Sequence, residues 1–160
     1  MVYVVQLQVI EYRAVIGCSE SDATMSSRQA GRILKMLQKL LLISAAGALG
    51  TLARYGLAGL VQRNSGTFFP CGTLAVNAVG CLIAGLLWTL CEYRLQISGS
   101  TRAIFFVGFL GAFTTFSTFI LETGGMINDS EYMRAGLNIL LQNTLGIIAF
   151  FAGVFAGRIF

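Results

Sequence analysis

Residues 108–119 read Gly-Phe-Leu-Gly-Ala-Phe-Thr-Thr-Phe-Ser-Thr-Phe and lie inside a long apolar run, from about Arg102 to Ile127. Glycine accepts unusual backbone dihedrals, and hydroxyl side chains offer the backbone alternative hydrogen-bond partners. We therefore expect the helix in this run to break midway. Inside a membrane a broken backbone needs surrounding protein or a water-filled cavity, so a break would mark a ligand or ion site. The stretch equally fits a face of small residues that packs against another helix.

Three polar side chains that follow the expected break share one helix face. Thr115, Thr118 and Glu122 are spaced i, i+3 and i+7, and Phe116 and Phe119 lie beside them. This face would combine hydroxyl groups, aromatic rings and a carboxylate within one membrane span.

The other apolar runs also carry polar groups. Arg54 lies toward one end of the first run, where it either snorkels to the interface or supplies positive charge at the mouth of an anion path. Asn77 is central in the second run, on a small, polar face with Thr73, and serves either a helix–helix hydrogen bond or a pore lining. Asn138 and Gln142 are spaced by four in the last run. Because amides are costly to leave in lipid, both should face the bundle interior.

The composition indicates an all-α polytopic membrane protein. Of the 160 residues, 56% are hydrophobic and 11% charged, and the mean hydropathy is +0.75. Apolar runs of about 20 residues suffice to cross the ~30 Å hydrocarbon core. We expect residues 39–160 to form one transmembrane domain of four helices, with spans at about 40–61, 72–91, 102–127 and 135–157.

Residues 1–38 are predicted to be an N-terminal extension outside this domain. They lack the basic start of a signal peptide, and we expect them to be disordered or to precede a native start at Met25 or Met36. Basic residues gather at the end of this segment and in the second loop. By the positive-inside rule, they place both termini in the cytoplasm.

The residue types exclude several classes of function. There is no histidine, the cysteines have no metal-ligand spacing, and no nucleophile–base set is apparent, which argues against an enzyme. No nucleic-acid motif accompanies the net charge of +4. A cation path would show acidic rings. Hydroxyls, amides and the positive edges of aromatic rings instead favour a small anion.

Three motifs carry a resemblance to a known family. They are GALGTLARY (47–55), GTLAVNAVG (72–80) and GFLGAFTTFSTF (108–119), the last followed by Glu122. Over about residues 40–157 the chain resembles the CrcB/Fluc family of small fluoride channels. The resemblance implies passive export of cytoplasmic fluoride across the cell inner membrane. It also implies an antiparallel, dual-topology homodimer with two pores and a broken third helix, although the bias of basic residues favours one orientation.

The resemblance also assigns roles to individual residues. Backbone carbonyls of Gly111 and Thr114 would hold a structural sodium ion on the dimer axis, and Ala112 replaces a glycine that is common in the family. The anion pathway would comprise Phe116, Phe119, Asn77, Thr115, Thr118, Glu122, Arg54, Asn138 and Gln142. The fourth-helix track of Asn138 and Gln142 departs from the tyrosine and serine of relatives.

Two alternatives remain open at this point. A proton-coupled small-solute transporter would use Glu122, and its flux would need a pH gradient. A non-transporting bundle protein would use its Gly/Ser/Thr face for packing alone, in which case Phe116→Ile would disturb assembly rather than ion flux.

Overall fold

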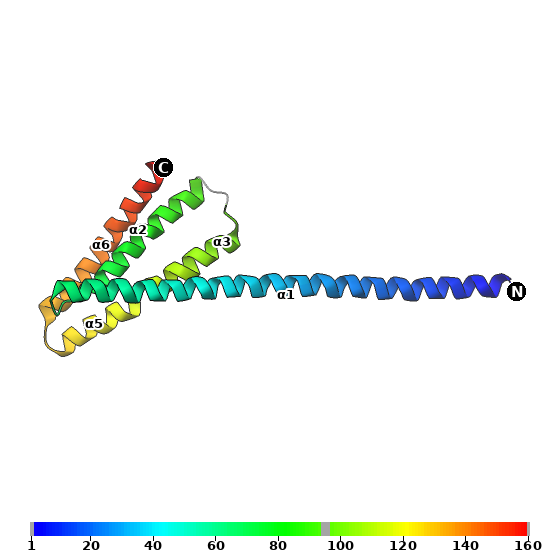
Figure 1. Ribbon diagram of the computed structural model, residues 1–160, viewed down its shortest axis with the longest axis horizontal. Helices are drawn as coiled ribbons and strands as arrows, with labels where there is room; N and C mark the ends of the chain where they lie inside the picture. The colour runs from blue at the N-terminus through cyan, green and yellow to red at the C-terminus, as the bar shows by residue number, and fades with distance from the viewer. Residues whose placement is uncertain (1, 94–96, 160) are drawn as a thin grey trace. The chain divides into compact units, whose positions relative to one another are not determined.

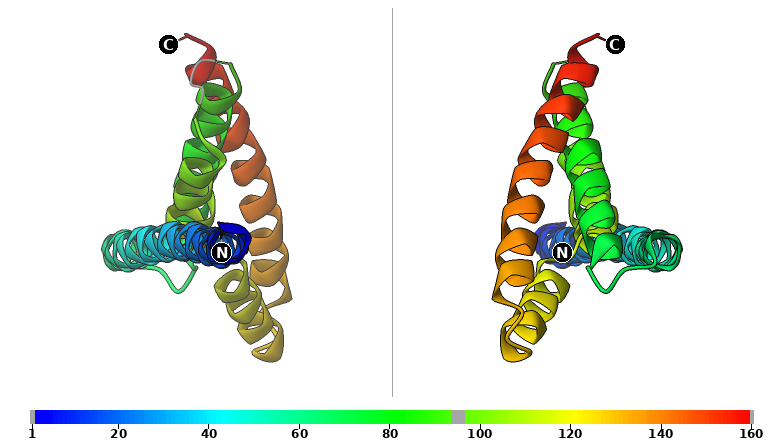
Figure 2. Two further views of the ribbon diagram at one scale, coloured as in Figure 1. Left: turned by 90° about the vertical axis from the view of Figure 1, so that its right-hand side faces the viewer. Right: turned by 90° about the vertical axis from the view of Figure 1, so that its left-hand side faces the viewer.

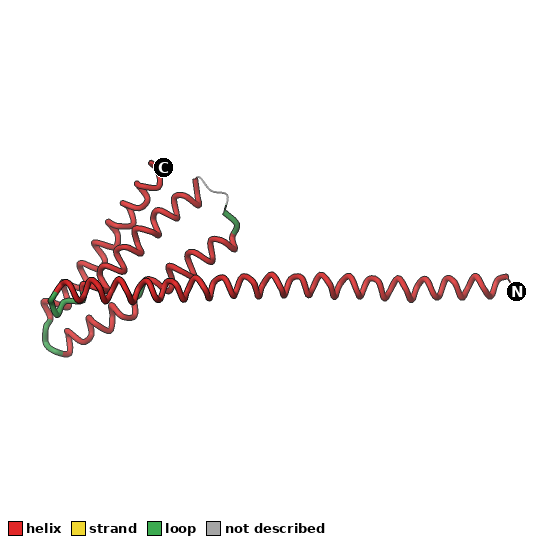
Figure 3. Tube along the Cα trace, viewed as in Figure 1, coloured by secondary structure: helices red, strands yellow, loops and turns green. Residues whose placement is uncertain are grey.

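Helices account for nearly all of the described chain (Figures 1 and 3). The computed structural model describes residues 2–93 and 97–159, with only the backbone described for residues 2–27. The long helices are α1 (Val2–Ser65), α2 (Cys71–Tyr93) and α6 (Tyr132–Ile159), and a segmented third span precedes α6. Four stretches are long and apolar enough to cross a membrane: Arg28–Ser65, Cys71–Tyr93, Gly99–Asn128 and Tyr132–Ile159. The predicted four-span, all-α membrane fold is thus confirmed for the described residues.

The chain forms two units, Met1–Leu40 and Leu41–Phe160. Residues 2–40 of the first unit are helical and belong to α1. Whether residues 1–38 are a non-native or disordered extension is not decided by this helix and stays a prediction. The second unit contains all the candidate site residues.

Within the second unit, α2 and α6 pack side by side, as the green and orange-to-red helices of Figure 2 show. Their backbones come into close contact at glycines. A Cβ atom on Gly85 would meet the carbonyl group of Phe150, and one on Gly153 would meet the carbonyl group of Leu82. Gly157, another small residue, follows Gly153 at a spacing of four. Small residues at this spacing let membrane helices approach closely enough for extensive dispersion contacts.

The end of α1 packs on its neighbours in the same way. A Cβ atom on Gly50 would meet the backbone of Phe109, and one on Gly72 would meet the α1 backbone. The side chain of Gln62 then holds the connection to α2. Its Nε2 donates to the carbonyl of Phe69 at 3.0 Å, and its Oε1 accepts a hydrogen bond from the Gly72 amide at 3.1 Å. These contacts fix the α1–α2 end of the second unit.

The third span consists of four helical segments. A seven-residue π-helix, η1, leads into one short turn, and two extended residues separate this turn from the last helix. The broken third helix is therefore confirmed. The segments are α3 (Gly99–Ala103), η1 (Ile104–Leu110), α4 (Gly111–Phe113) and α5 (Phe116–Asn128).

The break is not caused by the conformational freedom of the glycine backbone, so this part of our prediction was wrong. Gly111 is helical, with φ −62° and ψ −32°. A Cβ atom on Gly108 would lie 3.0 Å from the Cβ atom of Ala46, so the missing side chain serves close packing against α1. The break occurs instead at Thr114 and Thr115, where hydroxyl groups offer the backbone other partners.

Candidate ion pathway

Thr114 and Thr115 connect the two half-helices in extended conformations. Their φ/ψ angles are −81°/159° and −149°/109°. Thr115 is the N-cap of α5, because its Oγ1 accepts a hydrogen bond from the amide of Thr118 at 3.2 Å. Threonine is a favoured N-cap residue because its side chain satisfies an amide that lacks a partner within the helix. The hydroxyl-rich motif therefore supplies its own helix start in mid-membrane.

Asn77 on α2 pairs with both backbone polar groups of Thr115. Its Oδ1 accepts a hydrogen bond from the Thr115 amide at 2.9 Å, and its Nδ2 donates to the Thr115 carbonyl at 3.1 Å. Thr115 is only 8% exposed, so these backbone groups would otherwise be buried without partners. The same Nδ2 donates to Oε1 of Gln142 at 3.1 Å. One amide side chain thus joins α2, the break and α6.

The break also diverts the normal donors of two backbone carbonyls. In a continuous α-helix each carbonyl accepts from the amide four residues later. The Thr115 amide donates to Asn77 rather than to the Gly111 carbonyl, and the Thr118 amide donates to the Thr115 side chain rather than to the Thr114 carbonyl. Carbonyls at unwound helix ends carry partial negative charge and are suitable ligands for sodium. The residues present therefore fit a sodium ion.

Phe116 and Phe119 form an edge-to-face pair in the first turn of α5. Their ring centroids are 5.5 Å apart, and the ring planes make an angle of 62°. Phe119 is buried, whereas Phe116 is 74% exposed in the single chain. Ring edges carry the positive part of the aromatic quadrupole, and the α5 N-terminus adds partial positive charge. This end of α5 is therefore suited to an anion.

Asn138 and Gln142 of α6 face the interior of the bundle, as their spacing predicted, at 0% and 8% exposure. Asn138 Nδ2 donates to the hydroxyl group of Thr123 at 3.0 Å. Within residues 28–93 and 97–159, Gln142 Nε2 and Asn138 Oδ1 are buried without a hydrogen-bond partner. A buried donor without a partner calls for an explanation, and a passing anion would accept from Gln142.

A cavity of about 1000 Å³ in the second unit includes Thr115 and Thr118 in its wall. Arg54 of α1 and Glu122 of α5 also line it. Thr73 donates its hydroxyl hydrogen to Glu122 Oε1 at 2.6 Å, while Glu122 Oε2 has no partner among the described side chains. The predicted face of Thr115, Thr118 and Glu122 thus lines one cavity that reaches the break.

Arg54 contributes one of the charges in the cavity wall, which also contains Arg134 and three acidic residues, Glu122, Asp129 and Glu131. The Arg54 side chain is half-buried, and it is absent from the salt bridges formed between described residues, which join Arg102 to Glu92 and Arg134 to Glu131. A charge within a concave, low-dielectric wall concentrates counter-ions in the cavity. The role of Arg54 at the mouth of an anion path stays a prediction.

Comparison with known proteins assigns the family. Residues 41–154 match the family model described as "CrcB-like protein, Camphor Resistance (CrcB)". The chain belongs to the CrcB family. A relative from Desulforapulum autotrophicum is 55% identical over 124 residues, which are 78% of this chain and 99% of the relative. A relative from Nitrosococcus oceani is 50% identical over 118 residues, 74% of this chain and 94% of the relative. Both relatives bear the name "Fluoride-specific ion channel FluC".

In this CrcB-family chain, the sequence-predicted residues gather at two connected places. Asn77, Gln142 and the phenylalanine pair surround the break, and Arg54 and Glu122 line the cavity. Thr115 and Thr118 belong to both places. Asn138 lies apart from them and bonds to Thr123, four residues beyond Phe119. It stays a prediction that these residues form the anion pathway.

Two residues of the site were not among the predicted pathway residues. Thr73 anchors Glu122, and Thr123 anchors Asn138. Thr73 lies four positions before Asn77 on the same helix face, and Thr123 lies eight positions after Thr115. The spacing of four from Asn77 could have indicated Thr73. Thr123 lies near the end of its span, and no local sequence pattern distinguishes it.

Proposed function

We propose that this chain is a fluoride-selective channel that lets cytoplasmic fluoride leave the cell passively. The relatives bear the name of a fluoride-specific ion channel. The observation that carries the proposal is the edge-to-face pair of Phe116 and Phe119 in the first turn of α5, directly after the break. Ring edges and a helix N-terminus stabilise an anion without a fixed positive charge that would trap it.

The path would replace the water that surrounds a fluoride ion in solution. Arg54 draws anions into the cavity, whose inner wall contains the hydroxyl groups of Thr115 and Thr118. Gln142 offers a buried N–H without a partner among the described residues, and the rings of Phe116 and Phe119 offer their edges. Several weak sites in series favour passage, because an ion must enter each site and also leave it.

The physiological sense of such a path is release of a trapped weak acid. Neutral hydrogen fluoride crosses the membrane and ionises in the cell, and the anion cannot return through lipid. A passive channel lets it leave down its electrochemical gradient, with the negative interior of the cell as the driving force.

We further propose that the path is completed by a second, antiparallel copy, giving a dual-topology homodimer with two pores. Phe116 is 74% exposed and Leu121 is 76% exposed, and Gly111 at the break is also exposed. Backbone carbonyls beside a break are costly to leave in hydrocarbon, so protein has to cover this face. A second copy would cover the rings and the break together. Cross-linking of Leu121→Cys between copies in vesicles would support this arrangement, and its absence from conducting protein would contradict it.

Sodium is proposed to bind between the two breaks, on the carbonyls of Gly111 and Thr114. The diversion of the Thr115 and Thr118 amides supports these oxygens as ligands. The ion would neutralise partial negative charge at the ends of the two α4 segments. Replacement of sodium by N-methylglucamine should lower the thermal stability of the dimer, and equal stability in both salts would contradict the proposal.

The function is tested by efflux from liposomes that contain the purified chain, with valinomycin to clamp the voltage and chloride as the control anion. We expect fast fluoride efflux without chloride efflux, and its loss in Phe116→Ile. Phe151→Ile is the matched control, because Phe151 is also exposed, at 64%, and is also half of an edge-to-face pair. Absence of fluoride efflux from folded wild-type dimers would overturn the proposal. Equal loss in both variants would overturn the assigned role of Phe116.

A further inference from the structure

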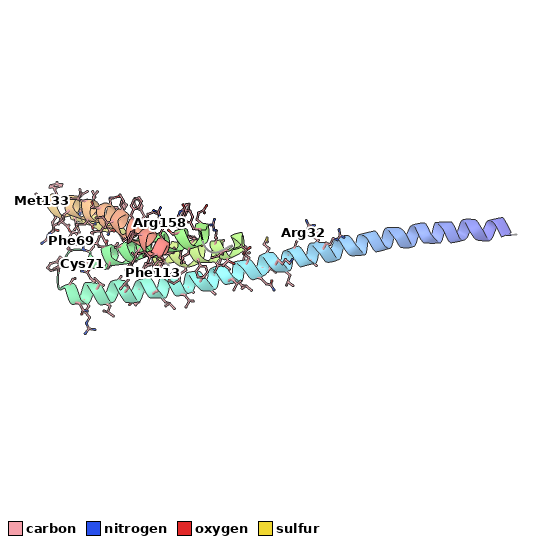
Figure 4. The ribbon with its side chains drawn as sticks, turned by 90° about the horizontal axis from the view of Figure 1, so that it is seen from above. Arg32, Phe69, Cys71, Phe113, Met133 and Arg158 are labelled. Atoms are coloured by element: carbon pink, nitrogen blue, oxygen red, sulfur yellow. The ribbon has the colours of Figure 1, made fainter. Side chains whose placement is uncertain are left out.

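Residues 28–41 form a segment of α1 with two chemically different faces. Its basic side chains recur at spacings of four, three and four residues: Arg28, Arg32, Lys35 and Lys39. At about 100° per residue they fall within an arc of about 60°. Figure 4 shows the Arg32 side chain projecting from the helix. The segment contains no aspartate or glutamate, so this face is uniformly positive.

The opposite face is apolar and exposed. Its six large side chains are between 48% and 70% exposed: Ile33, Leu34, Met36, Leu37, Leu40 and Leu41. At the same periodicity they cover an arc of about 160°, whose centre lies about 150° from that of the basic residues and which also includes Gln29. An exposed apolar face of this width is costly in water, so it indicates a surface that becomes covered.

Most of this segment precedes the part of the chain that the family model matches, which begins at residue 41. The match to the relative from Desulforapulum autotrophicum includes 99% of that relative but only 78% of this chain. The apolar helical stretch Arg28–Ser65 has 38 residues. At about 1.5 Å per residue it is about 57 Å long, whereas the hydrocarbon core is about 30 Å thick. Part of it therefore lies beyond the core.

We propose that residues 28–41 bind the surface of an anionic membrane as an interfacial amphipathic helix. The apolar face would lie at the boundary between headgroups and acyl chains, and the basic face would attract the negative lipid headgroups. Covalent continuity with the first span keeps the segment close to the bilayer, so binding does not require recruitment from solution. The surface attachment is a property of this segment and does not depend on what the channel conducts.

A coiled coil between copies fits the observations less well. A coiled-coil seam is a narrow stripe, whereas this apolar arc is about 160° wide at helical periodicity. Helices that pair also use opposite charges beside the seam, and this segment carries only basic ones. Two copies would repel each other, while an anionic lipid surface is complementary in charge to the basic face.

The test uses the full chain with its cysteines replaced by alanine, in vesicles of phosphatidylcholine alone or mixed with phosphatidylglycerol. Spin labels at Leu37→Cys and Gly31→Cys report the apolar and polar faces, respectively. In the anionic vesicles we expect the Leu37 label to be accessible to oxygen and shielded from a water-soluble nickel relaxant, and the Gly31 label to behave in the opposite way. This contrast should weaken in phosphatidylcholine alone and at high salt.

Charge variants separate the proposal from the alternatives. Arg28→Gln/Arg32→Gln/Lys35→Gln should weaken surface binding by roughly 100-fold, since each basic side chain contributes about five-fold near an anionic surface. Arg28→Lys/Arg32→Lys keeps the charge and should leave the contrast unchanged. Two results would overturn the proposal. One is water accessibility of both labels in anionic vesicles. The other is a Leu37 label that is shielded from both relaxants and whose spectrum is broadened by a second spin in either lipid. That result would indicate that copies of the chain pair through this segment.

Discussion

Asn77 lies opposite the break, and its replacement by alanine tests the account of how this break is stabilised. The substitution removes three hydrogen bonds, two to the backbone of Thr115 and one to Gln142. Hydrogen bonds between membrane helices average about 0.6 kcal/mol and reach about 1.7 kcal/mol. The loss of three such hydrogen bonds should lower the free energy of unfolding by roughly 2–5 kcal/mol. This is a large fraction of the stability of a typical domain.

The free energy of unfolding can be measured by steric trapping in bicelles, and fluoride efflux can be measured on the same preparations. Asn143→Ala is the matched control. Asn143 is an exposed asparagine in the fourth span, and it donates only to the carbonyl of Ile139 within its own helix, at 2.7 Å. We expect Asn77→Ala to lose both stability and efflux, because the Thr115 backbone loses its partners. Equal unfolding free energies for the two variants, with unchanged efflux, would refute the reasoning.

Three further predictions concern helix packing, the cavity and proton coupling. Gly153→Ala should lower the unfolding free energy by about 1–3 kcal/mol, because the new Cβ atom would meet the α2 backbone. Gly56→Ala is the control and should not lower it, because nothing lies within 4 Å of a Cβ atom there. Similar stabilities for both variants in bicelles would contradict this packing. Arg54→Gln should reduce fluoride efflux about ten-fold at low ionic strength and less at high salt, while Arg158→Gln, outside the cavity wall, should have no such effect; a salt-independent loss would argue against electrostatic attraction. Voltage-driven efflux should persist without a pH gradient in both wild type and Glu122→Gln, and a gradient requirement lost only in the variant would instead support proton coupling.

The membrane architecture could be predicted because it depends on local composition. Each span is an apolar run of sufficient length, and the connections between spans carry glycine, proline or charged residues. The break in the third span was also predictable, because four hydroxyl residues within residues 114–118 weaken a helix locally. The assignment of the break to glycine was wrong, since Gly108 serves packing against α1. A sequence window cannot distinguish a glycine that bends the backbone from one that admits a neighbouring helix.

The residue types of the candidate site could likewise be predicted, but not their partners. The spacing of Thr115, Thr118 and Glu122 placed them on one face, and the structure finds all three in one cavity wall. Asn77 remained open between a helix–helix bond and a pore lining. The structure shows that it bonds to both Thr115 and Gln142, which are 38 and 65 residues away in sequence.

The sequence by itself determined the class of the protein, its four spans, the presence of a break and its resemblance to the CrcB family. These features follow from hydropathy and from spacings of three or four residues, which act within one helix. The tertiary structure decided where the helix breaks, which amide stabilises the break and which carbonyls lose their donors. The physical reason is that a buried backbone group has to find its partner in another helix. That partner is known only when the helices are packed together, as Asn77 of α2 is against Thr115.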